Sequence, residues 1–321
     1  MTGEVPLVFV FAEFCLCYNT ECFPCQGIQL WPPQLASLVL QNKKVIYGLL
    51  LRASAETLLE VARKPRHLGA EIGFFSVLHT WNQKLQLHPH VHCVIPAGGL
   101  SPDHLRWIRS RPRFFLPIHV LRRVFRGKFV AGLKLAFQRG QLHLAGNLAS
   151  LTQPKIFASW LRPLFRKDWI IYSKPPFGGP DYVLNYLGRY THRVAISNHR
   201  LLSFDDGQVT FRWRDSAHNN EQQLMTLALD EFLRRFLLHL LPKSFVRIRH
   251  FGFLASRRRA QLLPLLQEFA LRADITVLLG HLCLVIASVR PPGMLVWSSL
   301  QVERRRVDPW HQVALFLRLI G

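Results

Sequence analysis

Acidic residues are scarce in this chain of 321 residues, which has 19 Asp and Glu against 41 Lys and Arg and a formal net charge of +22. A surplus of positive charge this large is most naturally neutralised by a polyanion. Of the cations, 31 are Arg and 10 are Lys, and the planar guanidinium of Arg forms paired hydrogen bonds with phosphate. The charge balance therefore favours nucleic acid as a partner, with an incidental basic surface as the alternative.

The sequence also lacks features that define several other protein classes. Residues 1–6 include Glu4 and no basic stretch, so they do not resemble a signal peptide. The apolar stretches at 5–18 and 275–289 are interrupted by polar residues and fall short of the ~20 residues that a spanning helix needs. A Gly-rich phosphate loop of the GxxxxGK(S/T) type is missing, so we expect no nucleotide cofactor. We expect a soluble, cytoplasmic protein with no membrane partner.

Cysteine is used sparingly and unevenly, since four of the six cysteines lie within residues 15–25. This clustering differs from the distributed cysteines of a disulfide framework. Residues 1–31 are therefore compositionally different from the rest of the chain.

Hydrophobic residues make up 49% of the chain, which is enough for a folded core. Helical spacing of apolar residues predicts helices at 33–64, 117–137, 155–165, 180–192 and 227–240. Alternation and turn residues predict strands at 69–81, 88–96, 169–172, 194–204, 209–214 and 245–249. Strands and helices that interleave through hairpin connections favour an α+β fold, with a mainly antiparallel sheet flanked by helices.

Three histidines occupy alternate positions in an apolar stretch, Leu87-His88-Pro89-His90-Val91-His92. In a strand, residues i and i+2 face the same side, so His90 and His92 would lie side by side. Burying two imidazoles without a shared ligand would leave polar nitrogens to satisfy. The pair therefore favours a metal site over two satisfied core histidines.

A metal site of this kind needs a third ligand. If 73–81 and 88–96 pair as a hairpin centred between Lys84 and Leu85, His79 falls opposite His90. We prefer His79 as this ligand and keep His88 as second choice, because His88 is two strand steps from His92, roughly 13 Å along the backbone. Three imidazoles with an open position, taken alone, favour zinc and therefore a hydrolase.

A second candidate site is a row of tyrosines, because Tyr182, Tyr186 and Tyr190 recur every four residues and would share one face of a helix. The simplest interpretation is an aromatic stripe packed on the sheet, but Arg189 and Arg193 are unusual neighbours for a buried face. A phenol has a pKa near 10 and needs a cation or a metal to act as a nucleophile. Tyr186 and Tyr190 are therefore candidate nucleophiles that a metal at the histidines could serve.

Four separated motifs together resemble a known family. They are His88–Cys93, Phe125–Phe129, Lys174–Gly179 and Tyr186–Ser197, and they occur in the order found in two-tyrosine HUH rolling-circle transposases of the insertion sequence ninety-one family. The resemblance covers roughly 33–266. It implies an HUH-type core that nicks and transfers single-stranded DNA at transposon ends, with Mg²⁺ or Mn²⁺ at the histidines and a 5′-phosphotyrosine on Tyr186 or Tyr190.

Cations beside the nucleophiles, on the predicted hairpin, on the strand at 245–249 and on the helix at 117–137 would contact DNA phosphates in such an enzyme. The candidates are Arg189, Arg193, Arg212, Arg214, Arg247, Arg249 and Lys128. For those outside the tyrosine helix, an ordinary solvated charge is the alternative.

The resemblance implies three parts of the chain: a degenerate cysteine-rich segment at 1–31, a catalytic domain at 32–269, and a divergent C-terminal tail of unknown role at 270–321. The N-terminal part departs from the family pattern. Such transposases usually begin with a cysteine-rich zinc domain, and Cys22 and Cys25 resemble its last pair, but Cys15 and Cys17 lack the expected spacing. We therefore expect a truncated or rearranged zinc-binding region, in which Zn²⁺ binding is doubtful. Two alternatives to the nickase stay open: a histidine-zinc hydrolase, and a catalytically inactive DNA-binding remnant of a transposase.

Overall fold

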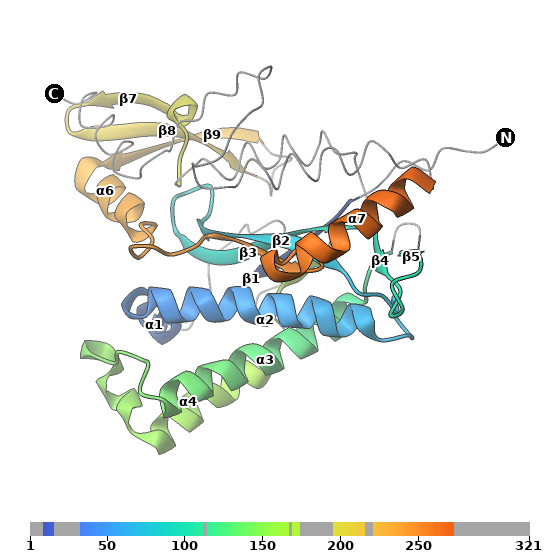
Figure 1. The fold of residues 1–321 in the computed structure, drawn as a ribbon. Coiled ribbons are helices and arrows are strands. Elements are labelled where there is room, and N and C mark those ends of the chain that lie inside the picture. The colour runs from blue at the N-terminus through green and yellow to red at the C-terminus, as the bar shows by residue number, and fades with distance from the viewer. Residues whose placement is uncertain are drawn as a thin grey trace.

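The structure is a computed structural model, and it describes residues 9–15, 33–111, 114–166, 169–173, 195–215 and 221–272. Within these residues a central sheet packs against helices (Figure 1). Every strand pairing found there is antiparallel. The predicted α+β fold with an antiparallel sheet is therefore confirmed.

The central sheet has five strands in the order β10-β2-β3-β1-β6. The strands are β1 (Phe9–Cys15), β2 (Gly73–Trp81), β3 (Leu87–Pro96), β6 (Ile171–Ser173) and β10 (Ile248–Gly252). β3 is the middle strand, and all ten of its residues are buried. Both faces of this strand are therefore covered.

Helices cover one face of this sheet (Figure 1). They are α1 (Pro33–Gln41), α2 (Lys43–Arg63), α3 (Ile118–Gln138), the short 3-10 helix η1 (Gly146–Thr152) and α4 (Pro154–Arg166). The ring of Phe125 on α3 lies 5.1 Å from that of Phe14 and 5.6 Å from that of Trp169. A Cβ on Gly132 would lie 2.3 Å from Leu49 Cδ1, so glycine allows α3 to approach α2 closely.

The two faces of β3 are chemically different because side chains alternate along a strand. Val91, Cys93 and Ile95 belong to the main core beneath the sheet. His90 and His92 alternate with them and therefore face away from α2 and α3. The predicted histidine strand thus separates an apolar face from an imidazole face.

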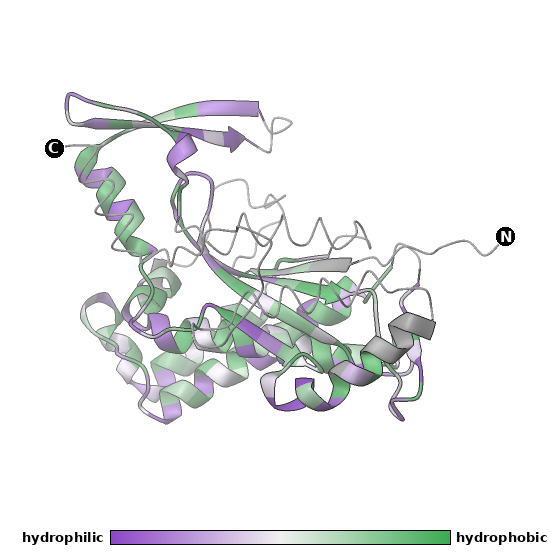
Figure 2. Ribbon diagram, turned by 45° about the horizontal axis from the view of Figure 1, so that its top comes forward, coloured by the Kyte–Doolittle hydropathy of each residue, from purple (hydrophilic) through white to green (hydrophobic). Residues whose placement is uncertain are grey.

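A second, smaller unit stands beside the sheet and is called here the β7–β9 module. It contains β7 (Leu201–Asp205), β8 (Gln208–Asp215), β9 (Glu221–Ala228) and α6 (Leu229–Leu238), preceded by the 3-10 helix η2 (Asn198–Arg200). Its own small core includes Phe211, Phe232 and Phe236, and also Leu85 from the β2–β3 turn. Both the helices beneath the central sheet and the strands β7–β9 mix hydrophilic and hydrophobic positions (Figure 2).

The far edge of the molecule carries β4 (Gly98–Leu100), β5 (Trp107–Arg109) and α7 (Ser256–Arg272). Glu71 joins them, since its carboxylate accepts two hydrogen bonds from Arg258 and lies 2.8 Å from His104 Nε2. The Arg258 guanidinium, followed by His104, holds the pKa of Glu71 below its usual value against the effect of burial. In the described part of the chain, no helix is both long enough and apolar enough to cross a bilayer.

Most predicted elements are found within two or three residues of their expected bounds. The predicted helix at 33–64 is two helices that meet at Asn42, whose side chain bonds both Leu38 and His143. The hairpin turn at Asp206-Gly207 and the second strand are confirmed. The first strand, expected from residue 194, begins at Leu201, because Asn198–Arg200 forms a 3-10 helix. The predicted helix at 180–192 lies outside the described residues.

Three further expectations differ from the structure. Residues 1–31 were expected to stand apart, whereas Phe9–Cys15 forms β1 between β3 and β6. The helix expected from residue 227 begins at Leu229. Up to Ala228 the side chains alternate between exposed and half-buried, as in a strand, and the acidic residues of the first helical turn come only after it. The strand expected at 245–249 begins at Ile248, since Ser244 has a φ of 61° and Phe245 N bonds Pro242 O in a turn.

Candidate metal centre

The β2–β3 hairpin brings three histidines together. Its register sets His79 opposite His90, as the sequence predicted, and Val77 opposite His92. Each of His79, His90 and His92 offers a ring nitrogen, and these atoms lie within 4.8 Å of one another. The three side chains are buried, with exposed fractions of 2%, 7% and 8%.

His88 lies next to this group but is not part of it. Its ring centroid is 4.8 Å from that of His90, whereas the cluster of mutually close nitrogens contains His79 instead. The backbone carbonyl of His88 has a separate role, because it lies 2.6 Å from His90 Nδ1. A carbonyl only accepts, so Nδ1 carries the proton and the lone pair of the neutral ring is on Nε2. A backbone partner of this kind commonly orients metal-bound histidines.

The electrostatics keep His79 in its neutral form. Burial, with smaller contributions from the charges of His90 and Arg247, holds the pKa of His79 well below its usual value of 6.5. A neutral imidazole is the form that binds a metal ion. The effect of Arg247 on the pKa of His79 indicates that a positive charge lies near the cluster.

Trp81 supports the ring of His79 from the same strand. The two rings are stacked, with centroids 5.1 Å apart and planes 18° from parallel. The register of β2 against β3 shifts between His79 and Trp81, and Trp81 packs against the core of the β7–β9 module. The module is therefore connected to the candidate metal centre through one indole.

The turn between the two histidine strands is anchored in the β7–β9 module. Leu85 is fully buried in the core of the module with a φ of 60°, a strained value for a residue other than glycine. The carbonyl of Leu85 accepts a hydrogen bond from His239 Nε2 at 3.0 Å, and that of Lys84 accepts one from Arg235 at 3.1 Å. The ammonium of Lys84 lies 4.0 Å from the centre of the Trp213 ring. These contacts hold the hairpin at its tip.

The donor set fits a divalent metal ion. Imidazole nitrogens bind Zn²⁺ readily and also bind Mn²⁺, and Mg²⁺ requires oxygen ligands such as water and phosphate to complete its shell. Neighbouring ligands of an octahedral ion with bonds of about 2.1 Å lie roughly 3 Å apart. The three ring nitrogens, which lie within 4.8 Å of one another, are close enough together to serve one ion.

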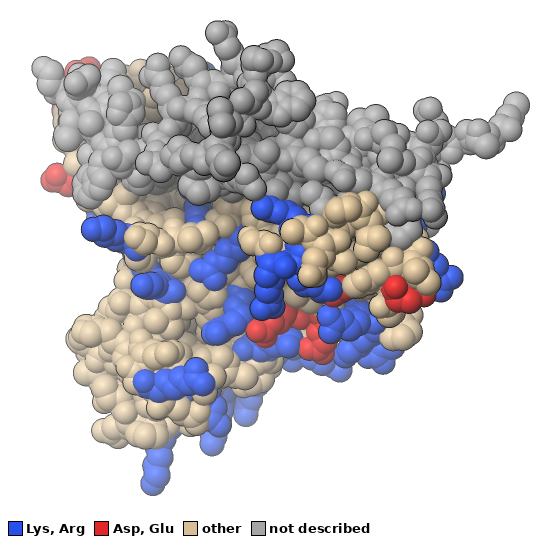
Figure 3. All heavy atoms as spheres, viewed as in Figure 1, with Lys and Arg blue, Asp and Glu red and all other residues tan. Residues whose placement is uncertain are grey.

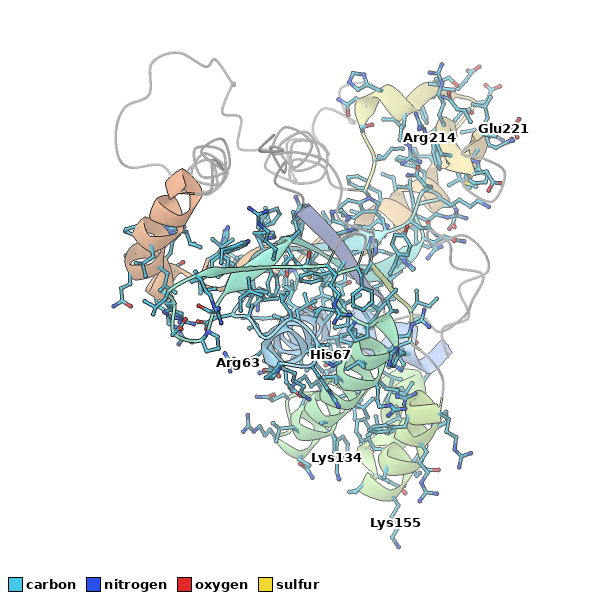
Figure 4. All side chains as sticks on the ribbon, turned by 90° about the vertical axis from the view of Figure 1, so that its right-hand side faces the viewer. Arg63, His67, Lys134, Lys155, Arg214 and Glu221 are labelled. Carbon is cyan, nitrogen blue, oxygen red and sulfur yellow. The ribbon has the colours of Figure 1, made fainter. Side chains whose placement is uncertain are left out.

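The other predicted site residues fall into two groups, those outside the described residues and those on the β7–β9 module, near β10 or on α3. Tyr186, Tyr190, Arg189 and Arg193 lie outside the described residues. Arg212 and Arg214 are exposed on β8 opposite Leu224 and Gln222, on the surface of the β7–β9 module. Arg214 and Glu221 lie together at the tip of this module, away from the helical layer (Figure 4).

Two of the predicted DNA contacts, Arg249 and Lys128, lie on the helical side of the sheet. Arg249 pairs in register with Ser76, whose hydroxyl bonds the core thiol of Cys93. Cross-strand partners share a face, so Arg249 lies on the helix side of the sheet. Arg247 lies just before the first residue of β10. Lys128 on α3 lies 2.9 Å from a carboxylate oxygen of Glu60 and 3.7 Å from one of Glu56.

Sequence reasoning missed the supports of the cluster. Trp81 is two residues from His79 on the same strand, so alternation could have identified it as a neighbour. His239 follows directly after α6 and bonds Thr80 and Leu85. No local pattern indicates that pairing, because the residues are more than 150 positions apart.

Comparison with known proteins gives consistent matches. A protein-family model described as "Putative transposase" matches residues 73–261, which is more than half of the chain. The chain is 54% identical over 230 residues to "Putative transposase y4qJ" of Sinorhizobium fredii (strain NBRC 101917 / NGR234), covering 72% of this chain and 58% of that protein. No solved structure matches the chain significantly.

A more distant match is to "Transposase for insertion sequence element IS801" of Pseudomonas savastanoi pv. phaseolicola. Identity is 28% over 300 residues, which cover 91% of this chain and 64% of that protein. The chain therefore spans about three fifths of the length of the curated relatives it matches.

Proposed function

The chain belongs to this transposase family, and from that premise we propose that it is a metal-dependent DNA strand transferase. It would cut single-stranded DNA at the end of a mobile element and remain joined to the new 5′ end. The single observation that carries the proposal is the cluster of His79, His90 and His92 on one buried face of the β2–β3 hairpin. Rolling-circle transposition is the pathway that this chemistry would serve.

The three histidines would hold Mg²⁺ or Mn²⁺. When bound, such an ion polarises the scissile phosphate and stabilises the charge that develops on it. The carbonyl of His88 would keep the His90 ring in the tautomer that presents Nε2, and Trp81 would fix the orientation of His79. The guanidinium of Arg247 would attract a phosphate oxygen to this face.

Tyr186 or Tyr190 would supply the nucleophile. Its phenol oxygen forms a bond to phosphorus and loses its proton, the bond from phosphorus to the 3′ oxygen breaks, and that oxygen takes up a proton. The phosphotyrosine ester conserves the energy of the phosphodiester, so no nucleotide cofactor is required. The second tyrosine would accept the next strand, with Arg189 and Arg193 neutralising the phosphates beside them.

Covalent capture tests this proposal. The full chain is incubated with a labelled single-stranded oligonucleotide that carries the end of the element, with Mn²⁺ or with EDTA, and products are separated under denaturing conditions. We expect a protein–DNA band that needs metal, disappears in Tyr186→Phe/Tyr190→Phe, and falls by about 10² to 10³ in His92→Ala, because metal polarisation contributes several kcal/mol. Unchanged covalent product in the double tyrosine variant would refute the proposed nucleophiles.

A histidine-zinc hydrolase is the second candidate, and the all-imidazole donor set favours it. It predicts cleavage that depends on Zn²⁺ and survives the loss of both tyrosines. The third candidate, an inactive DNA-binding remnant, predicts salt-sensitive DNA binding and no covalent product with any metal.

A further inference from the structure

One long stretch of the chain contains no acidic residue. Residues 104–167 include 14 Lys and Arg and neither Asp nor Glu, although the whole chain has 19 acidic residues. This stretch supplies α3, η1 and α4, which lie on the opposite side of the central sheet from the β7–β9 module (Figures 1 and 4). Lys and Arg are spread over the visible surface of the helices, with few acidic residues among them (Figure 3).

The exposed cations of α4 form a single line. Lys155, Arg162 and Arg166 are all exposed, and exposed Ser159 continues the same row at helical spacing. The opposite face of the helix, Phe157, Leu161 and Leu164, is buried. α4 therefore presents to solvent an edge on which every charged residue is a cation.

A second line runs along α3. Exposed Arg123 and Lys134 are eleven residues apart, which is about three helical turns. Between them lie Gly127, around which a Cβ would meet open space, and the exposed Ala131. Small residues between cations allow a broad surface to approach the helix closely.

The two lines belong to one rigid layer. Phe137 of α3 and Phe157 of α4 stack with ring centroids 4.0 Å apart and planes 9° from parallel. Lys134 and Lys155 both lie on the side of this layer that is farthest from the central sheet (Figure 4). Among the residues that the structure describes, no carboxylate pairs with any of these five cations: Arg123, Lys134, Lys155, Arg162 and Arg166.

We propose that the outer surface of α3 and α4 binds the phosphate backbone of duplex DNA, at a site separate from the histidine centre. α3 is about 31 Å long and α4 about 20 Å, and a duplex carries one negative charge per about 1.7 Å of its axis. Exposed cations held at fixed intervals on two helices suit a regular polyanion, whereas single strands are usually bound through aromatic stacking in a groove. The inference uses the action of the family on DNA but not the metal chemistry.

A charge-matched pair of variants tests this surface. Lys155→Gln/Arg162→Gln/Arg166→Gln removes three exposed cations from α4, and Lys44→Gln/Arg66→Gln/Lys243→Gln removes three exposed cations from elsewhere. Binding of a fluorescent 20-base-pair duplex is measured by anisotropy in EDTA, from 50 to 200 mM salt. We expect the α4 variant to bind about tenfold or more weakly at low salt, with a salt slope smaller by about 2.7, and the control to change about twofold.

Equal losses in the two variants would overturn the proposal, because they would reflect net charge alone. Unchanged duplex binding combined with weaker binding to phosphatidylglycerol vesicles would overturn it in favour of a lipid surface. If the α4 variant does not fold, Arg123→Gln/Lys134→Gln on α3 is expected to weaken duplex binding in the same direction, and no change there would also refute the site. The duplex test contains no metal, so a failure of covalent capture leaves its result unaffected.

Discussion

On β3, the side chains of Val91, Cys93 and Ile95 face the helices, whereas His88, His90 and His92 face the other way, and all six are buried. The apolar face is stabilised by the area it removes from water. The imidazole face gains less from burial, because each ring nitrogen must be satisfied. Equal burial therefore conceals two kinds of environment, one that stabilises the fold and one that is organised for chemistry.

The largest expected effect is on stability, from a substitution in the core that packs against the apolar face of β3. Phe125 is fully buried and its ring lies near those of Phe14, Phe129 and Trp169. We expect Phe125→Ala to lower the free energy of unfolding by about 3–5 kcal/mol, because it leaves a cavity in the core. Urea unfolding followed by circular dichroism measures this loss. Leu135→Ala on the same helix is the control, since Leu135 is 41% exposed and a change within about 0.5 kcal/mol is expected.

The next effect concerns His239, which follows α6 and bonds Thr80 of β2 and Leu85 of the β2–β3 turn. Its Nε2 donates to Leu85 O, so Nδ1 accepts from the Thr80 hydroxyl and the ring is neutral. Burial lowers the pKa of His239 from 6.5 to about 4. The unfolded chain therefore binds a proton that the folded chain does not, and about 3 kcal/mol of stability is lost as the pH falls from about 6.5 to 4.

Unfolding titrations at several pH values measure this loss. His239→Gln keeps a donor and an acceptor but cannot titrate, so its stability is expected to fall less over the same interval. A wild-type and a variant profile that fall in parallel would contradict the assignment of the acid sensitivity to His239.

The smallest effect separates two histidines on the imidazole face. We expect His79→Ala to weaken Mn²⁺ binding about tenfold or more, or about 1.4 kcal/mol, because it removes one member of the cluster. His88→Ala is expected to change it less than about threefold, since the bond to His90 uses the His88 backbone carbonyl. Isothermal titration calorimetry measures both affinities, and the opposite ranking would establish His88 as the third ligand.

The elements that the sequence predicted well are those with local causes. His79 was placed opposite His90 because the turn length and the alternation of the two strands together set a hairpin register. The turn at Asp206-Gly207 was identified from residues that favour positive φ, and both have it. In each case the relevant residues are close in sequence.

The elements that were missed depend on long-range contacts. β1 pairs with β3 across about 80 residues, and an apolar stretch carries no information about its partner. The sequence alternates over 245–249 and predicted a strand there, but the turn before Ile248 leaves Arg247 outside β10. The positive φ of Leu85 was not predictable either, because the module that holds it is formed by residues more than 100 positions away.

The buried tip of the β2–β3 hairpin has a practical consequence for engineering the protein. Hairpin tips usually tolerate inserted tags or new chain termini. Here, however, Leu85 at the tip is buried in the core of the β7–β9 module. An insertion between Asn82 and Gln86 would separate the module from the sheet and disturb both histidine strands. The exposed Asp206-Gly207 turn offers a more suitable position for a fluorescent label or a fusion partner.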